Sequence, residues 1–247
     1  MKKIGILGGI GWPSTIEYYR LICEASQTYH QGKGFSGIIP MPEISIESLN
    51  MHFTVNNRGS SEEGSWAAWD EYFKEAIRRL EVSGAELIVI ASVTPHARLE
   101  EISKGIGTPI VSIYESIGSH CKDHGIKNIL VLGTALTMKS PAFKRGVEKF
   151  GVNALHPQTE QLQHQVINVI ERLYQNRTDG TASDIENLVR SCIPSDELDQ
   201  TAVCLGCTEL SLAFKGFCNS PTFEYQGISY INSSVVHSLS AFQRCVA

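Results

Sequence analysis

The chain alternates short runs of apolar residues with longer segments in which apolar residues recur every three or four positions. Several short runs are continuous stretches of Ile, Val and Leu, which is typical of strands covered on both faces. The longer segments have the spacing of amphipathic helices. We therefore predict strands at Lys3–Gly8, Gly37–Met41, Glu86–Ser92, Pro109–Ser112, Asn128–Gly133, Ala202–Gly206 and Ser229–Ser233, and helices at Ser14–Tyr29, Trp66–Ser83, Lys139–Phe150, Glu160–Tyr174 and Asp184–Cys192.

This alternation predicts an α/β fold in which parallel sheets carry helices on both faces. Glycine-ended strands recur at similar offsets in the first and second parts of the chain, which indicates two similar doubly wound halves. We expect residues 1–112 plus 222–247 to form the first half and residues 113–221 the second. Because ligands of such sheets bind beyond the carboxyl ends of the strands, we expect the active site in a cleft between the halves.

Composition and charge narrow the kind of ligand. Of the 247 residues, 42% are hydrophobic and 19% are charged, and the formal net charge at pH 7 is −5. The composition is ordinary for a globular protein, and a mildly acidic chain without a basic block is a poor partner for nucleic acid or an anionic membrane. No apolar run approaches the roughly 18–20 residues of a membrane span. We therefore expect a small-molecule substrate, no nucleic acid and no membrane.

The seven cysteines are an odd number in a long chain. The apolar run at the amino terminus ends in glycines too early for a signal peptide, so we expect reduced thiols and a cytoplasmic protein. Cys204 and Cys207 have the spacing of a redox pair, but Cys204 lies inside a predicted apolar strand, which disfavours that role. No cluster of His, Cys and Asp has the spacing of metal ligands, so we expect no metal.

A glycine-rich motif, Gly8–Thr15, follows the first predicted strand. Its glycines allow the backbone to approach a ligand, and Ser14 or Thr15 can cap the next helix and offer a hydroxyl. The motif lacks the spacing of a dinucleotide site and the ending of a P-loop, which disfavours nucleotide binding.

Three further motifs follow predicted strands: Ser92-Val93-Thr94-Pro95-His96, Gly133-Thr134 with Thr137-Met138, and Gly206-Cys207-Thr208-Glu209-Leu210. A cysteine between a strand and a helix can feel the helix dipole, which lowers a thiol pKa from its usual value of about 8.5. The hydroxyls of Thr94, Thr134 and Thr208, together with backbone amides, could bind a carboxylate. Ser92 could equally be a plain strand-end hydroxyl, and His96 could simply cap a helix.

In order and spacing, these motifs resemble the cofactor-independent aspartate/glutamate racemase family over nearly the whole chain. The resemblance implies two α/β halves facing each other across a cleft, no cofactor, and a homodimer. It also implies that one cysteine removes the α-proton of an amino acid while another returns a proton from the opposite face. Cys207 falls on the second-half cysteine.

The chain departs from the family pattern at several of the implied positions. Ser92 occupies the first catalytic position, and Val93 stands where an Asn helps to hold the substrate. His164 falls where aspartate-specific members carry Lys. The resemblance also makes Arg58 a candidate contact for a side-chain carboxylate.

The resulting hypothesis is racemisation of aspartate or glutamate with four catalytic residues. Cys207 as a thiolate abstracts the α-proton, and Ser92, which is too weak a base, donates a proton or positions a water that does so. His96 and Glu209 tune the two sides. Thr94, Thr134, Thr208 and the loop Gly9–Thr15 hold the α-carboxylate. The complete substrate-binding set is Gly9, Ile10, Ser14, Thr15, Arg58, Val93, Thr94, Thr134, Thr137, His164 and Thr208.

Two alternatives stay open at this point. The chain could be a family member with altered chemistry, an isomerase or lyase acting on a related carboxylate. It could also be a carboxylate-binding protein with weak turnover, because Ser92 is not a strong base.

Overall fold

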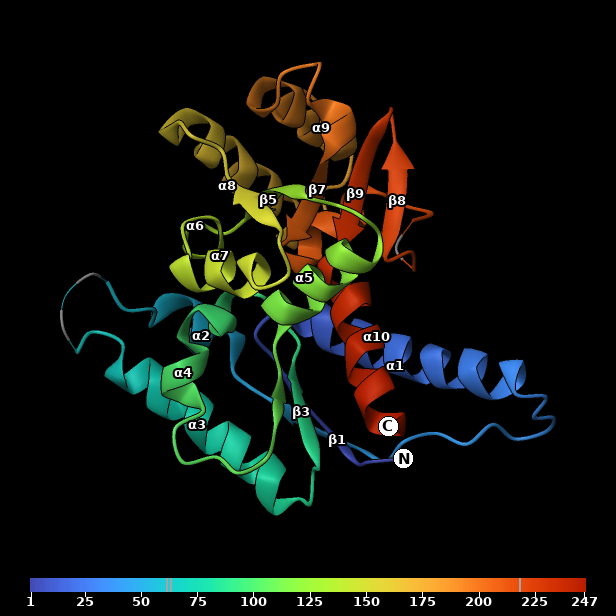
Figure 1. Cartoon of the computed structure of the whole chain (residues 1–247). Helices are drawn as coiled ribbons and strands as arrows, with labels where there is room; N and C mark the ends of the chain where they lie inside the picture. The colour runs from blue at the N-terminus through green and yellow to red at the C-terminus, as the bar shows by residue number, and fades with distance from the viewer. Residues whose placement is uncertain (61, 63, 218) are drawn as a thin grey trace. The chain divides into compact units, whose positions relative to one another are not determined.

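The computed structural model describes residues 1–60, 62, 64–217 and 219–247 and divides the chain into two compact units (Figure 1). The first unit comprises Met1–Ser112 with His237–Ala247, and the second comprises Ile113–Val236. Each unit contains one sheet, of four strands in the first and five in the second. The predicted α/β fold of two parallel-sheet halves is therefore confirmed.

The sheet of the first unit has the order β2-β1-β3-β4, and all its pairs are parallel. Its strands are β1 (Ile4–Gly8), β2 (Ile44–Ser48), β3 (Leu87–Ile90) and β4 (Ile110–Val111). The helices of this unit are α1 (Trp12–Gly32), α2 (Met51–Asn56), α3 (Ala67–Val82), η1 (Thr94–Arg98) and α4 (Leu99–Ile102).

Two clusters of apolar side chains cover the two faces of this sheet. On one face, Tyr18 and Ile22 of α1 and Phe242 of α10 (Ser233–Val246) pack with residues of β1 and β3. On the other face, the buried stripe of α3, which includes Trp69 and Phe73, packs on the alternate residues of the same strands. Residues of β1 and β3 are buried throughout, as their continuous apolar sequences predict.

The sheet of the second unit has the order β6-β5-β7-β9-β8. Its strands are β5 (Asn128–Gly133), β6 (Asn153–Leu155), β7 (Thr201–Gly206), β8 (Thr222–Tyr225) and β9 (Ile228–Asn232), and only β8 among them runs antiparallel to its neighbour. The helices are α5 (Ile113–Asp123), α6 (Ala135–Met138), α7 (Pro141–Glu148), α8 (Glu160–Tyr174), α9 (Thr181–Cys192), η2 (Leu198–Gln200) and η3 (Thr208–Ala213).

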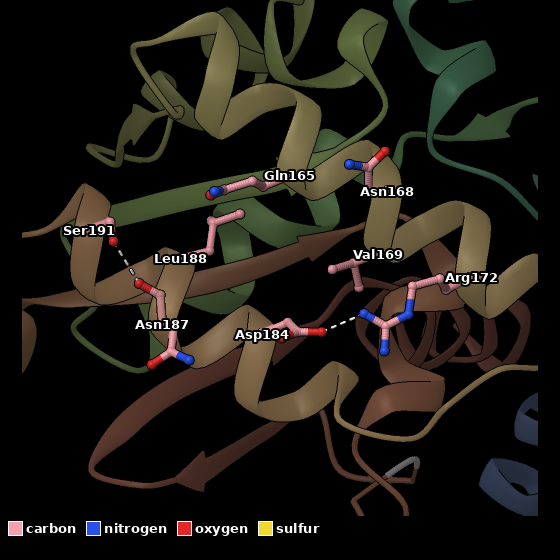
Figure 2. A pocket seen from close by; sticks show the side chains of 8 residues that line it. All are labelled: Gln165, Asn168, Val169, Arg172, Asp184, Asn187, Leu188 and Ser191. Atoms are coloured by element: carbon pink, nitrogen blue, oxygen red, sulfur yellow. Dashed lines mark hydrogen bonds and ion pairs between the residues drawn. The ribbon is translucent and has the colours of Figure 1, made fainter.

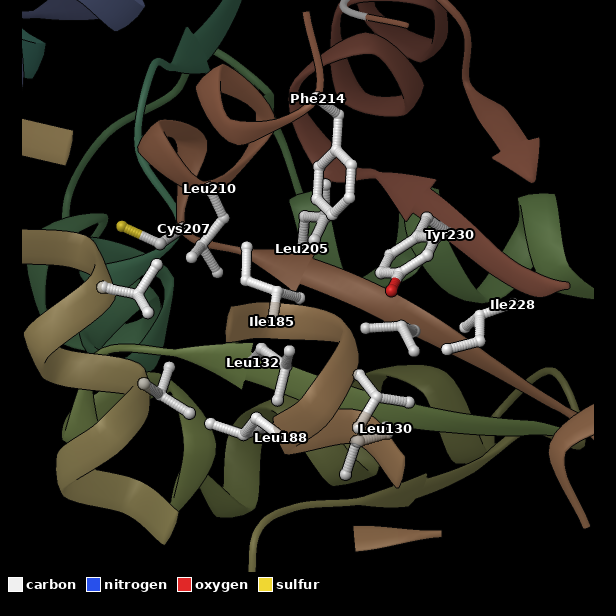
Figure 3. Packing of buried hydrophobic residues seen from close by; sticks show 14 of the residues in the cluster. Leu130, Leu132, Ile185, Leu188, Leu205, Cys207, Leu210, Phe214, Ile228 and Tyr230 are labelled. Carbon is white, nitrogen blue, oxygen red and sulfur yellow. The ribbon is translucent and has the colours of Figure 1, made fainter. Parts of the chain in front are cut away.

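The core of the second unit lies between its sheet and helices α8 and α9 (Figure 3). Leu130, Leu132 and Leu205 point into this cluster from β5 and β7, and Val166 and Ile185 meet them from the two helices. Cys207 lies at the edge of the cluster, and its sulfur points away from the aliphatic and aromatic side chains.

The structure corrects the predicted boundary near the carboxyl terminus. We expected residues 222–247 to join the first half, but β9 pairs with β7 and β8 pairs with β9, so both strands extend the second sheet. The chain returns to the first unit inside α10, between Val236 and His237. The parallel pairing of β9 with β7 therefore places the hairpin of β8 and β9 in the second unit.

The strand predicted at Gly37–Met41 is also wrong. Gly37 has a φ of +101°, Pro40 interrupts the run, and Ile38 is 96% exposed. Proline cannot donate a ladder hydrogen bond, which excludes it from most strand positions. The strand beside β1 is instead β2, whose alternating Ile-Ser-Ile sequence suits a half-exposed sheet edge.

Candidate active site

Adjacent strands of the second unit end in a pair of glycines. Gly133 of β5 and Gly206 of β7 lie opposite each other in the parallel ladder. A Cβ on Gly133 would lie 2.7 Å from the carbonyl oxygen of Gly206, and a Cβ on Gly206 would lie 2.9 Å from that of Leu132. The close approach that these glycines permit brings Thr134 and Cys207 to neighbouring positions at one edge of the sheet.

A thiol and a carboxylate meet directly after β7. The Sγ of Cys207 donates a hydrogen bond to the Oε2 of Glu209 at 3.0 Å, and the hydroxyl of Thr208 donates to the same oxygen at 2.9 Å. Cys207 and Glu209 are 6% and 4% exposed. The structure thus brings together the predicted residues Cys207, Thr208 and Glu209 in one buried cluster.

The local fold at Cys207 differs from the predicted helix. Cys207 is the N-cap of η3, a six-residue 3-10 helix, and its carbonyl accepts a hydrogen bond from the amide of Leu210. A short 3-10 helix offers less dipole than the α-helix that we expected. The group in contact with the sulfur is instead the carboxylate of Glu209.

Burial acts on the thiols of the five other described cysteines. Burial raises the pKa of Cys121 to about 12 and that of Cys192 to about 11, and burial also raises the pKa of the thiols of Cys23, Cys204 and Cys245. These five thiols stay protonated near neutral pH. Cys204 is fully buried in β7, so it is a core residue, and Cys218 lies outside the described residues.

Thr134 and Thr137 occupy the turn after β5. Thr134 caps α6: its Oγ1 accepts a hydrogen bond from the amide of Thr137 at 3.3 Å and lies 3.1 Å from the Thr137 hydroxyl. Thr137 is buried, and its methyl group is one of the atoms that a side chain at Gly133 or Gly206 would meet. Both threonines therefore shape the strand end beside Cys207.

In the first unit, the loop after β1 makes a tight turn at Gly9. Gly9 has a φ of +72°, and a side chain there would collide with the backbone of Leu49. The amide of Gly9 donates a hydrogen bond to the hydroxyl of Thr15 at 2.9 Å. The hydroxyl of Thr15 therefore holds the loop in place. Ile10 and Ser14, which lie between Gly9 and Thr15 in the sequence, are buried.

The segment from Ser92 to His96 follows β3 at the same end of this sheet. The amide of Ser92 donates a hydrogen bond to the carbonyl of Ile90 at 2.8 Å, which turns the chain into the short helix η1. Ser92 is half-buried, whereas Val93, Thr94 and His96 are buried. The predicted substrate contact Val93 is therefore a buried residue of this turn.

Two buried histidines, His96 at the end of this segment and His237 of α10, contact each other edge-on. The rings of His96 and His237 are 5.4 Å apart and nearly perpendicular. Burial, and secondarily His237, lower the pKa of His96 well below its usual 6.5, and burial lowers the pKa of His237 to about 4. Both imidazoles are therefore neutral at pH 7.

Sequence reasoning assigned no role to Tyr18 or His237. The Nε2 of His237 lies 2.9 Å from the carbonyl oxygen of Val111, so this nitrogen carries the proton. The Nδ1 of His237 then accepts a hydrogen bond from the hydroxyl of Tyr18 at 2.9 Å. A buried Tyr–His–carbonyl chain thus joins α1, α10 and β4, although the three residues lie far apart in the sequence.

Arg58 and His164 are two of the predicted substrate contacts, and both rest on the family resemblance. Arg58 follows α2, and its Nε is buried with no hydrogen-bond partner among the described residues. His164 lies on the exposed face of α8, a helix that also contacts η3. Both assignments remain predictions.

The structure also contains a polar groove of about 340 Å³ between α8 and α9 (Figure 2). Arg172 and Asp184 form an ion pair across it, and Ser191 donates a hydrogen bond to the carbonyl of Asn187. None of the predicted site residues is among the eight that line this groove. We therefore place the candidate chemistry at the strand ends.

The described part of the chain shows neither a metal site nor a membrane-spanning helix. It contains no group of three His, Cys, Asp or Glu side chains placed to hold a metal ion. None of its helices has both the length and the hydropathy to cross a bilayer.

These features define a class of α/β protein with two sheet units. One unit carries a thiol–carboxylate pair directly after β7, and the other carries a serine and a buried, neutral histidine directly after β3. The chain belongs to the Asp/Glu/hydantoin racemase family, whose model matches residues 7–226. The resemblance inferred from the strand-end motifs is therefore confirmed.

Individual relatives agree with this assignment. The chain is 28% identical over 153 residues to the broad specificity amino-acid racemase RacX of Bacillus subtilis, an alignment that covers 62% of this chain and 63% of that protein. The match thus spans less than two thirds of that relative. The crystal structure of an aspartate racemase homologue from Pyrococcus horikoshii has a TM-score of 0.74 and 27% identity over the whole of both chains. The aspartate racemase of Picrophilus torridus, with 19% identity, shares the fold, with a TM-score of 0.70 over 99% of this chain and 94% of that one.

Proposed function

We propose that the protein is a cofactor-independent amino-acid racemase that acts on aspartate, glutamate or both. The observation that carries the proposal is the buried contact between the Cys207 thiol and the Glu209 carboxylate. Membership of the racemase family supports the reaction class. Similarity to a broad specificity amino-acid racemase and to an aspartate racemase homologue supports the substrate class.

Cys207 is the base in this proposal. Its hydrogen bond to Glu209 gives the thiol proton an acceptor, so transfer of that proton leaves a thiolate and a carboxylic acid. The thiolate then takes the α-proton of the L-amino acid and becomes a thiol again. The electron pair of the broken C–H bond stays on the substrate as a carbanion, which the contacts to the α-carboxylate stabilise.

Ser92 supplies the proton on the opposite side of the substrate. A serine hydroxyl can donate a proton, or hold a water that donates one, but it is a poor base near pH 7. Because two enantiomers have equal free energy, kcat/KM must be equal in both directions whatever the two groups are. The difference between Ser92 and Cys207 therefore appears in kcat and KM separately, and turnover is slow both ways.

The proposed substrate is acidic because a second carboxylate could reach Arg58. The Nε of this guanidinium is buried without a partner among the described residues, and an arginine suits bidentate binding of a carboxylate. Thr94, Thr134, Thr208 and the loop Gly9–Thr15 hold the α-carboxylate, and His164 is a further contact. If Arg58 does not bind the substrate, neutral amino acids should be used as well as acidic ones.

The proposal includes a cytoplasmic location and a homodimer, with no cofactor. Five described cysteines are free thiols, which fits a reducing compartment: Cys23, Cys121, Cys192, Cys204 and Cys245. The dimer follows from the family resemblance.

The test is NMR of L-aspartate, L-glutamate and a panel of neutral L-amino acids incubated with the protein in D₂O. We expect the Cα–H signal of an acidic amino acid to disappear, and we expect Cys207→Ala to abolish this exchange. A matched control, Cys192→Ser, removes a half-buried thiol with a raised pKa and should leave exchange unchanged.

A second candidate function rests on Ser92. With a hydroxyl in place of the first base, the chain could bind a carboxylate without turning it over. In that case the wild-type protein and Cys207→Ala would both be silent in the exchange assay, while calorimetry would still detect binding of aspartate or glutamate. That pair of results would reject the racemase proposal.

A further inference from the structure

Three aromatic side chains lie in a row at the start of α3. Trp66, which is the N-cap of this helix, Trp69 and Tyr72 occupy every third position, so they share one side of the helix. Packing explains part of the pattern, because Trp69 is 1% exposed and stacks on Phe73. Packing alone does not need the polar atoms of these rings, yet each of the three has a hydrogen-bond partner.

The partners of this aromatic row lie in the segment between β2 and α3. The hydroxyl of Tyr72 accepts a hydrogen bond from the amide of Asn50 at 3.0 Å. The indole N–H of Trp69 donates one to the carbonyl of Thr54, also at 3.0 Å. These two bonds hold the short helix α2 against α3, and α2 ends two residues before Arg58.

Trp66 holds the backbone on the other side of Arg58. Its indole N–H donates a hydrogen bond to the carbonyl of Ser60 at 2.9 Å. Its ring also lies against Gly59, where an added Cβ would come within 2.5 Å of the indole carbons. The ring would therefore have to move for any other residue at position 59. Arg58 thus lies between two stretches of backbone that the aromatic row holds in place.

A bidentate ion pair completes the surroundings of Trp66. The guanidinium of Arg98 lies 5.3 Å from the centre of the indole ring, which is within the range of a cation–π contact. The Nε of Arg98 donates to one carboxylate oxygen of Asp70 at 3.0 Å, and its Nη2 donates to the other. Arg98 ends η1, which begins two residues after Ser92. Trp66 therefore connects the segment of Arg58 with the segment that follows β3.

Arg58 itself has an unsatisfied polar atom. Its Nε is buried and has no hydrogen-bond partner among the described residues. The Nε and a terminal nitrogen of a guanidinium form a fork that binds a carboxylate through two parallel hydrogen bonds. Fixing the backbone around a long side chain lowers the entropy that is lost when a ligand orders it. The contacts of Trp66 therefore favour carboxylate binding by Arg58.

We propose that Trp66 is a positioning residue for substrate specificity: it holds Arg58 where the guanidinium binds the side-chain carboxylate of an acidic amino acid. Arg98 and Asp70 support the indole ring and act on the substrate only through it. The inference rests on the proposed function, from which it takes Arg58 as the carboxylate contact.

The first test measures exchange of L-aspartate and L-glutamate in D₂O by the wild type, Trp66→Ala and Arg58→Ala. Each variant should raise KM for the acid that the wild type uses by at least about 10-fold. The value of kcat should stay within about threefold, because a contact remote from Cα binds ground state and transition state alike. The double variant Arg58→Ala/Trp66→Ala should be no weaker than Arg58→Ala, since Trp66 acts through Arg58.

A conservative variant and a matched control accompany this test. Trp66→Phe keeps a ring but loses the N–H donor, so its KM should lie between those of the wild type and Trp66→Ala. Tyr174→Ala removes an exposed aromatic ring at the end of α8, outside the row, and should keep the wild-type KM. Circular dichroism checks the fold of every variant. A Trp66→Ala variant that lowers kcat as strongly as it raises KM, or additive effects in the double variant, would overturn the proposal.

The second test approaches the same contact from position 59 and leaves Trp66 in place. Gly59→Ala pushes its Cβ against the indole and should raise KM for the acid by about threefold or more. Once Trp66→Ala has removed the ring, adding Gly59→Ala should have no further effect. Gly32→Ala, where no atom lies within 4 Å of the added Cβ, is the control. A wild-type KM in Gly59→Ala would show that this contact does not position Arg58.

Calorimetric titration with L-aspartate and L-glutamate separates this inference from the racemase proposal. If the wild type binds an acid without exchanging its α-proton, the racemase proposal fails. Trp66→Ala should then still raise the dissociation constant of that acid by at least about 10-fold. An unchanged dissociation constant in Trp66→Ala, or a wild type that neither binds nor exchanges either acid, would overturn the positioning role.

Discussion

The two units of this protein place their candidate residues after adjacent parallel strands in the same way, but the residues at these positions have different chemistry. In each unit, two adjacent parallel strands carry the candidate residues: β1 and β3 in the first, and β5 and β7 in the second. The second unit follows β7 with a thiol hydrogen-bonded to a carboxylate. In the first unit, β3 is followed by Ser92 and by His96, which is neutral and contacts the neutral ring of His237.

This comparison shows that a shared framework does not fix acid–base capacity. A carboxylate can take a proton from the thiol beside it, so Cys207 can act as a base. Burial keeps His96 and His237 neutral, and His237 already uses both nitrogens in hydrogen bonds. We therefore propose that the second unit removes the proton from the L-amino acid and that the first unit returns one.

The largest effect is expected from making the second unit resemble the first. Cys207→Ser replaces the thiol by a hydroxyl that cannot form an anion near pH 7. Removal of the base should lower the rate of α-proton exchange in D₂O by at least about 1,000-fold. Loss of exchange should not be accompanied by loss of fold, which circular dichroism checks. Near-normal exchange in this variant would mean that another group is the base.

Acid should destabilise the first unit through its buried histidines. His237 has a pKa of about 4 in the folded chain against 6.5 when unfolded, so the unfolded state binds more protons between these values. The free energy of unfolding should therefore fall as pH drops from 6.5 to 4, by about 3 kcal/mol for this residue. The groups that act on His237 are the carbonyl of Val111, the hydroxyl of Tyr18, the ring of His96 and, at longer range, Arg244.

Urea unfolding at several pH values measures this dependence. The variant His237→Asn should show a shallower loss of stability on acidification than the wild type, although it is less stable at pH 7. The control His164→Gln alters an exposed histidine and should keep the wild-type slope. Equal slopes in all three proteins would contradict the buried neutral state of His237.

Glu209→Gln tests the thiol–carboxylate contact that distinguishes the second unit from the first. An amide cannot accept the Cys207 proton, so exchange at pH 7 should fall by about 100-fold. Raising the pH toward the usual thiol pKa of about 8.5 should restore much of the activity, because solvent then removes the proton. Glu224→Gln, an exposed acid on β8, is the matched control. A Glu209→Gln defect that stays constant with pH would indicate a structural role only.

The paired glycines of the second unit should also be sensitive to substitution. An alanine at position 133 would place its Cβ 2.7 Å from the carbonyl oxygen of Gly206, a backbone atom held in the sheet. Gly133→Ala should destabilise the protein by about 2 kcal/mol in urea unfolding. Gly32→Ala, where no atom lies within 4 Å of the added Cβ, should stay within about 0.5 kcal/mol of wild type. Equal stabilities would contradict the close packing of β5 and β7 ends.

The smallest change is expected from making the first unit resemble the second. Ser92→Cys supplies a thiol where the hydroxyl stands and should increase racemisation by about 10-fold. Ser92→Ala should lower racemisation by a similar factor while exchange of the L-amino acid persists through Cys207. Chiral chromatography measures the first quantity and NMR in D₂O the second. If both variants racemise at the wild-type rate, Ser92 takes no part in proton return.

The sequence carried enough information for the parallel strands and for much of the candidate site. Continuous apolar runs located β1, β3, β5 and β7, because strands buried on both faces need no polar alternation. Glycine-ended strands followed by Ser, Thr and Cys supplied the candidate catalytic residues, which stay predictions. The contact of Cys207 with Glu209 fits this, because the two residues are near neighbours in the chain.

The features that the sequence did not reveal depend on long-range contacts or weak local signals. The link between Tyr18, Val111 and His237 joins residues from three distant segments. The hairpin of β8 and β9 was assigned to the wrong half, because its place is decided by pairing with β7. The apolar run Gly37–Met41 predicted a strand that does not form, although Pro40 disfavours one. The short alternating sequence of β2 is a weaker signal and was not recognised as a strand.

The most direct test of the account is the fate of the α-hydrogen in a single reaction that starts from L-aspartate or L-glutamate in D₂O. The enantiomers are separated on a chiral column, and the deuterium content of each is measured by mass spectrometry. The account predicts that the D-enantiomer forms and carries deuterium at Cα, since Ser92 or its water exchanges with solvent. Deuterium confined to the L-enantiomer, with no D-enantiomer formed, would show that Cys207 works alone and would contradict the assignment of proton return to the first unit.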